Sequence, residues 1–289
     1  MSGLGVTVRT MPGDHPAGPD GIARPRVIVS VTATADGRVT LSRAERLLDD
    51  GPNRRWQAVW PPDARELLAR RATAIEQHHH PTVVLEGSGT FVADDAGSLD
   101  LPAAGTPAGV LRADFLPYRS TRWFAVVDAR GRVAWTHKGD DETSLLVIAS
   151  HSTPLPYLAR LRQERVPYLL AGTDRVDLRC ALAKVRAQLG AECLVSEAGG
   201  GLNGALLRAG LVDELHVITV PALAGGLGTP SIMDGPPLDS GSLPQQLRAI
   251  DVQVGGHGTI WAHYEVVPEA FTPLSHARSQ DRWKVGPAS

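Results

Sequence analysis

The sequence predicts an α/β protein, in which a mostly parallel sheet is covered by helices on both faces. Apolar runs of strand length alternate along the chain with amphipathic segments of helical period, which is typical of repeated strand–helix–strand units. Two further strand-like runs, 246–254 and 258–266, follow each other across a Gly-Gly-His turn and form a predicted hairpin. Because a hairpin pairs its strands antiparallel, the complete sheet is expected to be mixed.

Each element has a local cause in the sequence. Residues 26–33 are rich in β-branched side chains and predict a buried strand, whereas residues 61–77 begin with prolines and predict an amphipathic helix. The clearest helix covers 177–190, where Asp177 can cap the first turn and Gly190 can end the last. Further strands are expected at 81–85, 144–150, 166–172, 192–197 and 213–223, and a strand that ends in a turn at 122–133. Further helices are expected at 153–165 and 203–210, and a long loop at 96–118.

Composition limits the classes of function. The chain has 289 residues, of which 43% are hydrophobic, and a formal net charge of −2, so it can bury a large core but offers no basic face for nucleic acid. No apolar run is long enough to span a membrane, and residues 1–24 lack the apolar segment of a signal peptide. We expect a flexible leader at 1–24, one domain at 25–268 and a flexible tail at 269–289. Cys180 and Cys193 give no reason to pair, which favours a reduced, cytoplasmic protein.

A run of three glycines marks the most informative strand end. Gly199, Gly200 and Gly201 follow the predicted strand 192–197 and precede the predicted helix 203–210. In parallel sheets, ligands bind at the carboxyl ends of strands, where the N–H groups of the next helix can hold an anion and glycine lets the backbone approach it. The alternative is a tight strand–helix turn without a ligand, because the run is not a complete dinucleotide fingerprint.

Two other strand ends carry small or polar residues. They are Gly87, Ser88, Gly89 and Thr90 after one strand, and Ser150, His151 and Ser152 after another. Two glycine-lined ends in one sheet suggest a dinucleotide that lies across it. The hydroxyls and imidazole of 150–152 could hold a 2′-phosphate, which favours NADPH over NADH. The alternative for this segment is a cap on the helix that begins near Pro154.

Several motifs resemble one known family. The stretch SEAGGGLNGALLRAGLVDELHVITVPALAGGLGTP, at 196–230, resembles the VEGGGxLxxxLLxAGLVDELHL block of the riboflavin-biosynthesis pyrimidine reductase family, the reductase half of a bifunctional deaminase/reductase. Shorter motifs occur in the family's order: RPRVIVSVTATADGRV at 24–39, LEGSGTFVADD at 85–95 and FAVVDARGRV at 124–133. The resemblance covers residues 24–267. It implies a fold like that of dihydrofolate reductase, with a mixed sheet of about eight strands, and a homodimer.

The resemblance also implies roles for individual residues. The residues implied to contact the NADPH cofactor are Gly87, Ser88, Gly89 and Thr90 along its length, Ser150, His151 and Ser152 near its adenosine phosphate, and Gly199, Gly200 and Gly201 at its pyrophosphate. Asp36 and Arg38 would be catalytic in a loop near the nicotinamide, and Arg38, Asp95 and Glu197 would bind the substrate. The structural alternatives are a solvated turn for Arg38 and a cap for Asp95, whereas a carboxylate such as Glu197 at the end of a buried strand needs a partner.

The chain departs from the family's motifs at several places. Ala198 stands inside the glutamate–glycine block, so the register of the glycines could shift by one residue. The family's ADDPxLxxR is ADDAGSL here, without the arginine that helps to bind the substrate's phosphate, and Arg112, Arg119 or Arg122 could replace it. The segment 42–60 fits the family's pattern poorly. The motifs of a zinc deaminase are absent, and no metal is expected.

Histidine and tryptophan residues offer further candidates. His78, His79 and His80 are consecutive, and consecutive residues on a helix do not share a face, so we expect them at a solvated helix end rather than at a metal. His216 alternates into a strand and is expected in the core or at an interface. Trp60 could border the substrate pocket.

Three functions of different kinds remain open. The resemblance implies an NADPH-dependent reductase of a ribosylaminopyrimidine phosphate, which transfers hydride to the imine C1′ of the ring-opened ribose. A reductase of the same fold could instead act on a pterin, on dihydrofolate or on a natural-product imine. A non-catalytic ligand-binding protein on this scaffold is the third hypothesis. In each case the partner is a small molecule, with neither nucleic acid nor membrane expected.

Overall fold

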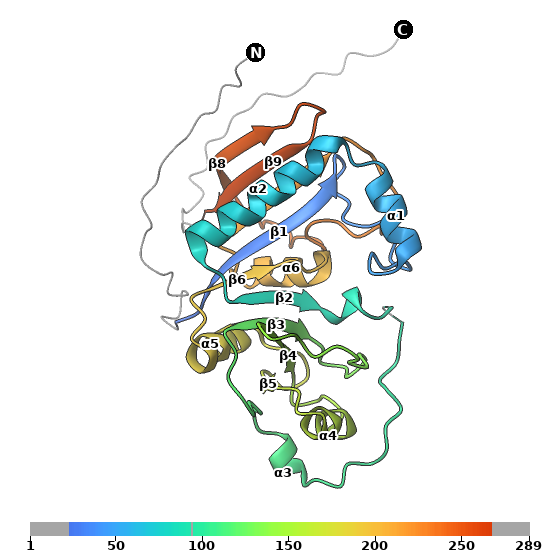
Figure 1. Cartoon of the computed structure of the whole chain (residues 1–289), viewed down its shortest axis with the longest axis vertical. Helices are drawn as coiled ribbons and strands as arrows, with labels where there is room; N and C mark the ends of the chain where they lie inside the picture. The colour runs from blue at the N-terminus through green and yellow to red at the C-terminus, as the bar shows by residue number, and fades with distance from the viewer. Residues whose placement is uncertain (1–22, 94, 268–289) are drawn as a thin grey trace.

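The structure is a computed structural model that describes residues 23–93 and 95–267. Helices pack on both faces of a single nine-stranded sheet (Figure 1). The strands are β1 (Arg26–Thr34), β2 (Val83–Gly87), β3 (Arg122–Val127), β4 (Thr143–Ala149), β5 (Tyr168–Leu170), β6 (Cys193–Ser196), β7 (Glu214–Val220), β8 (Leu247–Val254) and β9 (Ile260–Val266). The helices are α1 (Asp50–Ala58), α2 (Pro62–His79), α3 (Ala108–Leu111), α4 (Leu155–Gln163), α5 (Leu178–Leu189) and α6 (Gly200–Arg208), and Ser88–Thr90 form a short 3-10 helix.

The strand order is β5-β4-β3-β2-β6-β1-β7-β9-β8. The strands β1 to β7 pair in parallel, whereas β9 runs antiparallel to β7 and to β8. The predicted mixed sheet and its late hairpin are therefore confirmed. The parallel pairing brings the carboxyl ends of the central strands β2, β6 and β1 to one edge, which is where the candidate site lies.

Alternate residues of β1 point to opposite faces of the sheet. Val27, Val29 and Val31 pack in the hydrophobic cluster that includes α5 and α6, whereas Ile28 packs with Ile75 of α2. In the other half of the sheet, α4 packs against alternate residues of β4 and β5 on the face opposite α5. Both faces are thus covered, which explains why the parallel strands read as nearly continuous apolar runs.

The predicted helix ends are confirmed at α5. The carboxylate of Asp177 accepts a hydrogen bond from the backbone amide of Cys180 at 3.1 Å. Gly190 ends the helix with a φ of 72°, in the left-handed region that glycine enters without strain. Cys180 and Cys193 are both free, as expected.

Two segments differ from their predictions. The helix α1 forms in the segment 42–60, for which no helix was expected, because its only buried side chain is Trp56 and the helical apolar period is missing. The short helix α3 interrupts the expected loop at 96–118. The strand that ends in a turn, expected at 122–133, is confirmed: β3 ends at Val127, and the Asp128 carboxylate accepts hydrogen bonds from amides of the segment that follows.

The expected leader and tail lie almost entirely outside the described residues. Of the leader, Ala23 and Arg24 are described, and Arg24 is tied to the domain by an ion pair with Asp213. Within residues 23–93 and 95–267, none of the helices has the length and apolar character that crossing a membrane requires.

Asp213 joins the beginning of the sheet to the segment between α6 and β7. Its two carboxylate oxygens accept hydrogen bonds from the Arg24 guanidinium at 2.7 and 2.8 Å, and one of them also accepts from the Val27 amide at 2.7 Å. Asp213 and Arg24 are both largely buried. Hydrogen bonds to charged groups in such surroundings are the stronger ones in proteins, so Asp213 holds β1 beside β7.

We expect Asp213→Asn to lower the free energy of unfolding by roughly 2 to 3 kcal/mol. The neutral asparagine side chain lacks the negative charge that accepts hydrogen bonds from the Arg24 guanidinium and the Val27 backbone amide. Urea denaturation measures the change. Asp239→Asn, at an exposed position, is the matched control and should change the free energy by less than about 0.5 kcal/mol. Equal stabilities for the two variants would contradict this role of Asp213.

Candidate active site

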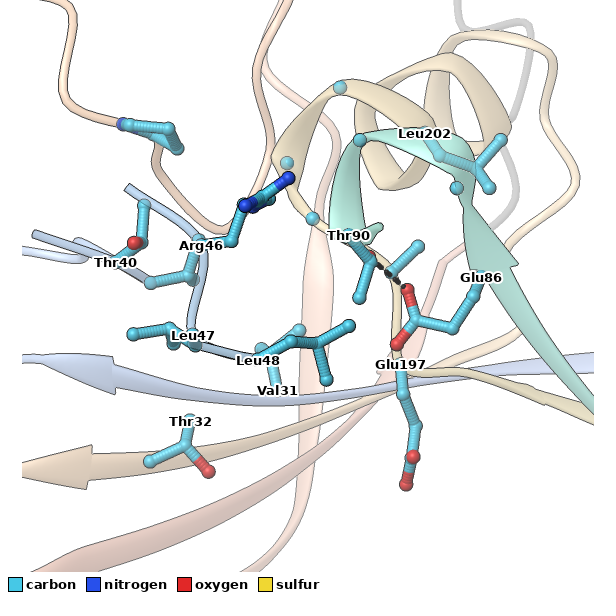
Figure 2. A pocket seen from close by; sticks show the side chains of 18 of the residues that line it. Val31, Thr32, Thr40, Arg46, Leu47, Leu48, Glu86, Thr90, Glu197 and Leu202 are labelled. Atoms are coloured by element: carbon cyan, nitrogen blue, oxygen red, sulfur yellow. Dashed lines mark hydrogen bonds between the residues drawn. The ribbon is translucent and has the colours of Figure 1, made fainter. Parts of the chain in front are cut away.

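A cavity of about 670 Å³ opens at the carboxyl ends of β1, β2 and β6. One wall consists of the strand ends and the turns after them, at 30–32, 86–90 and 197–202. The other wall consists of side chains from 39–48 and from α1. Figure 2 shows the two walls, with Glu86 and Thr90 facing Arg46 and Leu48.

The glycine run opens the helix α6 at this cavity. Gly199 is the N-cap residue and the helix begins at Gly200, so Ala198 lies before the cap and packs inward, 2% exposed. The three glycines thus occupy the N-cap and the first two positions of the helix. The amides of the first helical turn have no carbonyl partner within the helix, and they face a cavity that Gly199, Gly200 and Gly201 line.

The three glycines differ in what a side chain at each position would contact. A Cβ atom on Gly200 would lie 2.1 Å from the Ser231 carbonyl oxygen, so this glycine is required by the loop packed against it. Around Gly199 and Gly201, a Cβ atom would meet nothing within 4 Å. The packing of the chain therefore does not explain these two glycines, and open space beside helical amides fits a phosphate group.

The end of β2 forms the middle of the same wall. Gly87, Ser88, Gly89 and Thr90 all line the cavity. The Ser88 hydroxyl accepts a hydrogen bond from Arg132 at 2.9 Å, which holds the turn. The Thr90 hydroxyl donates to the Glu86 carboxyl group at 2.8 Å, the contact drawn as a dashed line in Figure 2.

Two carboxyl groups and one guanidinium surround the inner end of the cavity. Glu86 is 9% exposed, and burial together with the negative charge of Glu197 raises the pKa of Glu86 to about 8. Glu197 is exposed at the cavity wall. Arg71 of α2 donates to the Val31 carbonyl at 2.6 Å, and burial lowers its pKa to about 10, so it stays charged at neutral pH. Glu86 therefore holds a proton at neutral pH.

Two buried polar atoms of the cavity wall are unpaired. Within the described residues, the Thr40 hydroxyl and the Trp60 indole N–H have no hydrogen-bond partner, and both residues line the cavity. Buried polar groups are nearly always paired, so an unpaired donor beside a cavity favours a bound polar ligand. Trp60 thus borders the cavity, as proposed from the sequence.

The predicted loop residues Asp36 and Arg38 lie beside the cavity but do not line it. The Thr34 hydroxyl and the amides of Ala224 and Gly225 donate to Asp36 and lower its pKa to about 2. The Arg38 guanidinium donates to the Thr229 carbonyl at 2.7 Å. These bonds fasten the loop, and the catalytic roles of both residues stay predictions.

Asp95 and the segment 150–152 also lie outside the cavity lining. Asp95 is exposed, and residue 94 beside it is not among the described residues. The Ser150 and Ser152 hydroxyls are 2.9 Å apart, and Ser152 donates to the Asp174 carbonyl. This strand end lies on the same edge as that of β2, two strands away. The roles of these residues stay predictions.

The arginines considered for the substrate's phosphate are engaged elsewhere. Arg112 donates to the Thr153 carbonyl, Arg119 donates to the Gln188 carbonyl, and Arg122 pairs with Glu76. The arginines that do line the cavity are Arg43, Arg46 and Arg71.

Sequence reasoning missed several residues of the cavity wall. The chief ones are Glu86, Arg71, Thr40 and Trp56. The signal for Glu86 was a carboxylate at the end of an apolar strand: LEGSGTFVADD resembles the family's VGxGTVxADDP, in which valine stands at the position of Glu86. Arg71 and Trp56 carry no such signal, because their place in the cavity follows from helices packed far from them in sequence.

A cavity at the carboxyl edge of parallel strands, beside a helix N-terminus and a protonated carboxyl group, is typical of α/β proteins that bind a small-molecule ligand. The chain belongs to the family of the RibD C-terminal domain, whose model matches residues 25–261. The resemblance to the pyrimidine reductase family is thus confirmed.

Two curated relatives carry the same name, 2,5-diamino-6-ribosylamino-4(3H)-pyrimidinone 5′-phosphate reductase. The protein of Archaeoglobus fulgidus is 28% identical over 217 residues, which are 73% of this chain and 87% of the relative. The protein of Methanothermobacter thermautotrophicus is 37% identical over 100 residues, which are 35% of this chain and only 45% of the relative. The family is therefore one of oxidoreductases that act on small molecules with a nicotinamide cofactor.

Solved structures share the fold. RibD of Acinetobacter baumannii superposes with a TM-score of 0.56 at 20% identity, over 84% of this chain and 58% of that chain. A pyrimidine reductase-like protein of Corynebacterium diphtheriae gives a TM-score of 0.56 at 17% identity, over 85% of this chain and 93% of that chain. The fold of the dihydrofolate reductase type that the resemblance implied is confirmed, with nine strands where about eight were expected.

We expect stability to depend on pH through Glu86. Its pKa is about 8 in the folded protein against the ordinary 4.5, so the folded state binds the extra proton between these values. This contribution to stability is complete below about pH 4.5 and is lost as the pH rises through 8. Glu86→Gln cannot ionise, so wild-type protein should lose stability relative to this variant by at most about 1.4 kcal/mol per pH unit in this window.

Urea denaturation at about pH 5 and about pH 9 measures the difference between the two proteins. Glu66→Gln, at an exposed position of α2, is the matched control for the loss of one carboxylate. A stability difference between wild type and Glu86→Gln that stays constant with pH would show that Glu86 is ionised throughout.

Proposed function

We propose that the protein is an NADPH-dependent reductase that acts on a ribosylaminopyrimidine phosphate and transfers hydride to the imine C1′ of the ring-opened ribose. One observation carries the proposal: a single cavity joins the open amides of α6 to the carboxyl groups of Glu86 and Glu197. A cofactor and a polar substrate can therefore meet in the same space. The names of the relatives support the class of substrate.

The sheet edge offers a path for an extended dinucleotide. The first turn of α6 would hold the pyrophosphate, with Gly199 and Gly201 giving room for it. The segment 150–152 lies two strands beyond β2, which is about 10 Å along the edge. His151 is exposed there beside a loop that carries the exposed Arg175, and the His151 amide donates to the Gly172 carbonyl of that loop. Two basic side chains at this place favour a 2′-phosphate and hence NADPH.

The residues of the chain supply the proton and the orientation. A bound nicotinamide supplies hydride to the imine carbon. The imine nitrogen then needs a proton to give the ribitylamino product, and the protonated Glu86 lies in the cavity wall to donate it. Glu197 can accept hydrogen bonds from the amino groups of a pyrimidine, and the charge of Arg71 stabilises the ionised Glu197.

A basic side chain for the substrate's phosphate is present in the wall of 39–48. Arg46 lines the cavity, and its guanidinium is held by the Asp49 carboxylate and the Phe91 carbonyl. This position differs from that of the arginine in the family's motif. Arg38, Asp36 and Asp95 keep their predicted roles as hypotheses, with Arg38 and Asp36 in the loop next to Val39 and Thr40 of the wall.

A second candidate is reduction of a pterin, of dihydrofolate or of a natural-product imine by the same machinery. Two observations favour keeping it: the missing arginine of the ADD motif, and an ionisable Glu86 where the family's motif is apolar. A non-catalytic binding protein is the third candidate, and it shares the cavity but needs no turnover.

Titration with NADPH and NADH tests the cofactor. Trp56 and Trp60 line the cavity, so tryptophan fluorescence should report binding. We expect NADPH to bind more tightly than NADH. Gly201→Asp places a carboxylate at the proposed pyrophosphate without a clash, and it should weaken binding by about tenfold or more, equivalent to about 1.4 kcal/mol.

Gly97→Asp, in an open loop outside the cavity, is the matched control and should bind as the wild type does. A replacement at Gly200 would not serve, because its side chain would meet the Ser231 carbonyl. Absence of binding by either cofactor would overturn the reductase and leave the binding-protein candidate.

Measurement of enzymatic turnover with each candidate substrate then distinguishes the first candidate function from the second. Oxidation of NADPH with the ribosylaminopyrimidine phosphate, and none with dihydrofolate or a pterin, is the expected result. We expect the rate with wild-type protein to fall as the pH rises through about 8, where Glu86 loses its proton. Turnover with a pterin alone would replace the first candidate by the second.

We infer that the protein is a homodimer. The edge strand β8 leaves one side unpaired, and Leu247, Val252 and Val254 on it are exposed apolar side chains. An exposed apolar edge is commonly covered by a second copy. Light scattering of the eluting protein measures the mass, and a monomer at micromolar concentration would contradict the inference.

A further inference from the structure

Four side chains converge on the face of the sheet that α2 covers, near the amino end of β7. Glu214 and His216 lie two residues apart on β7 and therefore share a face, and His263 of β9 is the direct antiparallel neighbour of His216. His79 ends α2, which packs against β7 and β9 on this face (Figure 1). Of the three consecutive histidines at 78–80, His79 is thus the one that reaches the sheet.

The three imidazoles meet at one oxygen of Glu214. The distances from its Oε2 atom are 2.9 Å to His263 Nε2, 3.3 Å to His79 Nε2 and 3.6 Å to His216 Nε2. The ligand atoms of Glu214, His216 and His263 all lie within 4.8 Å of one another. In tetrahedral zinc sites, bonds of about 2.0 to 2.1 Å place neighbouring ligand atoms about 3.3 Å apart. Glu214, His216 and His263 thus have a spacing that an ion could bridge, and His79 contacts the same carboxylate oxygen.

Hydrogen bonding alone does not account for this arrangement. One carboxylate oxygen has two lone pairs, and three ring nitrogens surround it. His216 is 2% exposed, and neither of its ring nitrogens has a hydrogen-bond partner among the described residues. A buried imidazole of this kind normally finds a partner, and a cation among the four side chains would bind its Nε2 lone pair.

We propose that His79, Glu214, His216 and His263 form a binding site for a divalent transition metal ion, of which zinc fits best. Three imidazoles and one carboxylate are ligands that zinc accepts in four-coordinate sites. The other carboxylate oxygen of Glu214 accepts a hydrogen bond from Arg26 at 2.7 Å, which leaves one oxygen for the ion and orients it. This site departs from the expectation of a metal-free protein.

The site has an entry path and a structural role. His79 and His263 are 19% and 17% exposed, whereas Glu214 and His216 are 6% and 2% exposed, so the ion would enter from the α2 side and bind against a buried floor. The ligands lie toward the amino end of β7, which begins at Glu214, and His216 is in register with Ser30 of the cavity wall on β1. The ion would fasten the end of α2 to β7 and β9 without taking part in hydride transfer.

The test uses the full chain without a histidine tag, freed of metal by a chelator and titrated with zinc and with cobalt(II). We expect one ion per chain, a cobalt spectrum with the intense visible bands of tetrahedral coordination, and a higher midpoint of thermal unfolding with zinc. His79→Asn and His263→Asn should each weaken zinc binding by about tenfold or more, since even the loss of an outer-shell partner costs about that much.

His78→Asn is the matched control, because His78 is an exposed neighbour in the same histidine run and should leave zinc affinity unchanged. His79 and His263 are chosen because they are partly exposed. The circular dichroism spectra of the two variants verify that they fold. Less than half an ion per chain, a weak cobalt spectrum, or equal zinc affinity in His263→Asn and wild type would each overturn the proposal. Such results would leave the carboxylate–histidine cluster as a hydrogen-bonded network only.

Discussion

The turn between β6 and α6 is the constraint on which the candidate site depends. Asn203 is completely buried and accepts a hydrogen bond from the Ser196 hydroxyl while it donates to the Ala198 carbonyl, both at 2.7 Å. These two bonds tie the end of the strand to the first turn of the helix. The helical amides are thereby aimed into the cavity, and Glu197 is held at its wall. The cradle is thus built by rigid elements of the sheet, which is what precise positioning requires.

The candidate site also depends on the charges of the side chains in its wall. Glu86 and Glu197 line one cavity, but the burial of Glu86 makes a second negative charge there costly. Burial therefore keeps Glu86 protonated at neutral pH, so that it can donate a hydrogen bond in the cavity. Arg71 adds a fixed positive charge from the helix face and keeps the pair from repelling an anionic ligand. Glu86, Glu197 and Arg71 thus determine which hydrogen bonds a ligand can make at this end of the cavity.

The sequence predicted those features that depend on neighbours along the chain. The strand ends at Gly87 and Gly199 could be found because glycine turns follow apolar runs, and parallel strands bring such turns to one edge. The proton on Glu86 could not be found, because it depends on burial by segments remote in sequence. The convergence of His79 with Glu214 was missed for the same reason. The helix α1 was missed because one tryptophan, rather than a periodic apolar face, holds it.

Trp56, the one buried side chain of α1, also affects how a ligand can reach the cavity. The strand-end wall belongs to the sheet, whereas the opposite wall is a polar helix fixed by Trp56 and followed directly by α2. Segments with few buried contacts open at a small fraction of the global free energy of unfolding. The wall formed by α1 is therefore expected to unfold locally more readily than the sheet. Ligand exchange would then take place through the wall that also carries Thr40 and Arg46.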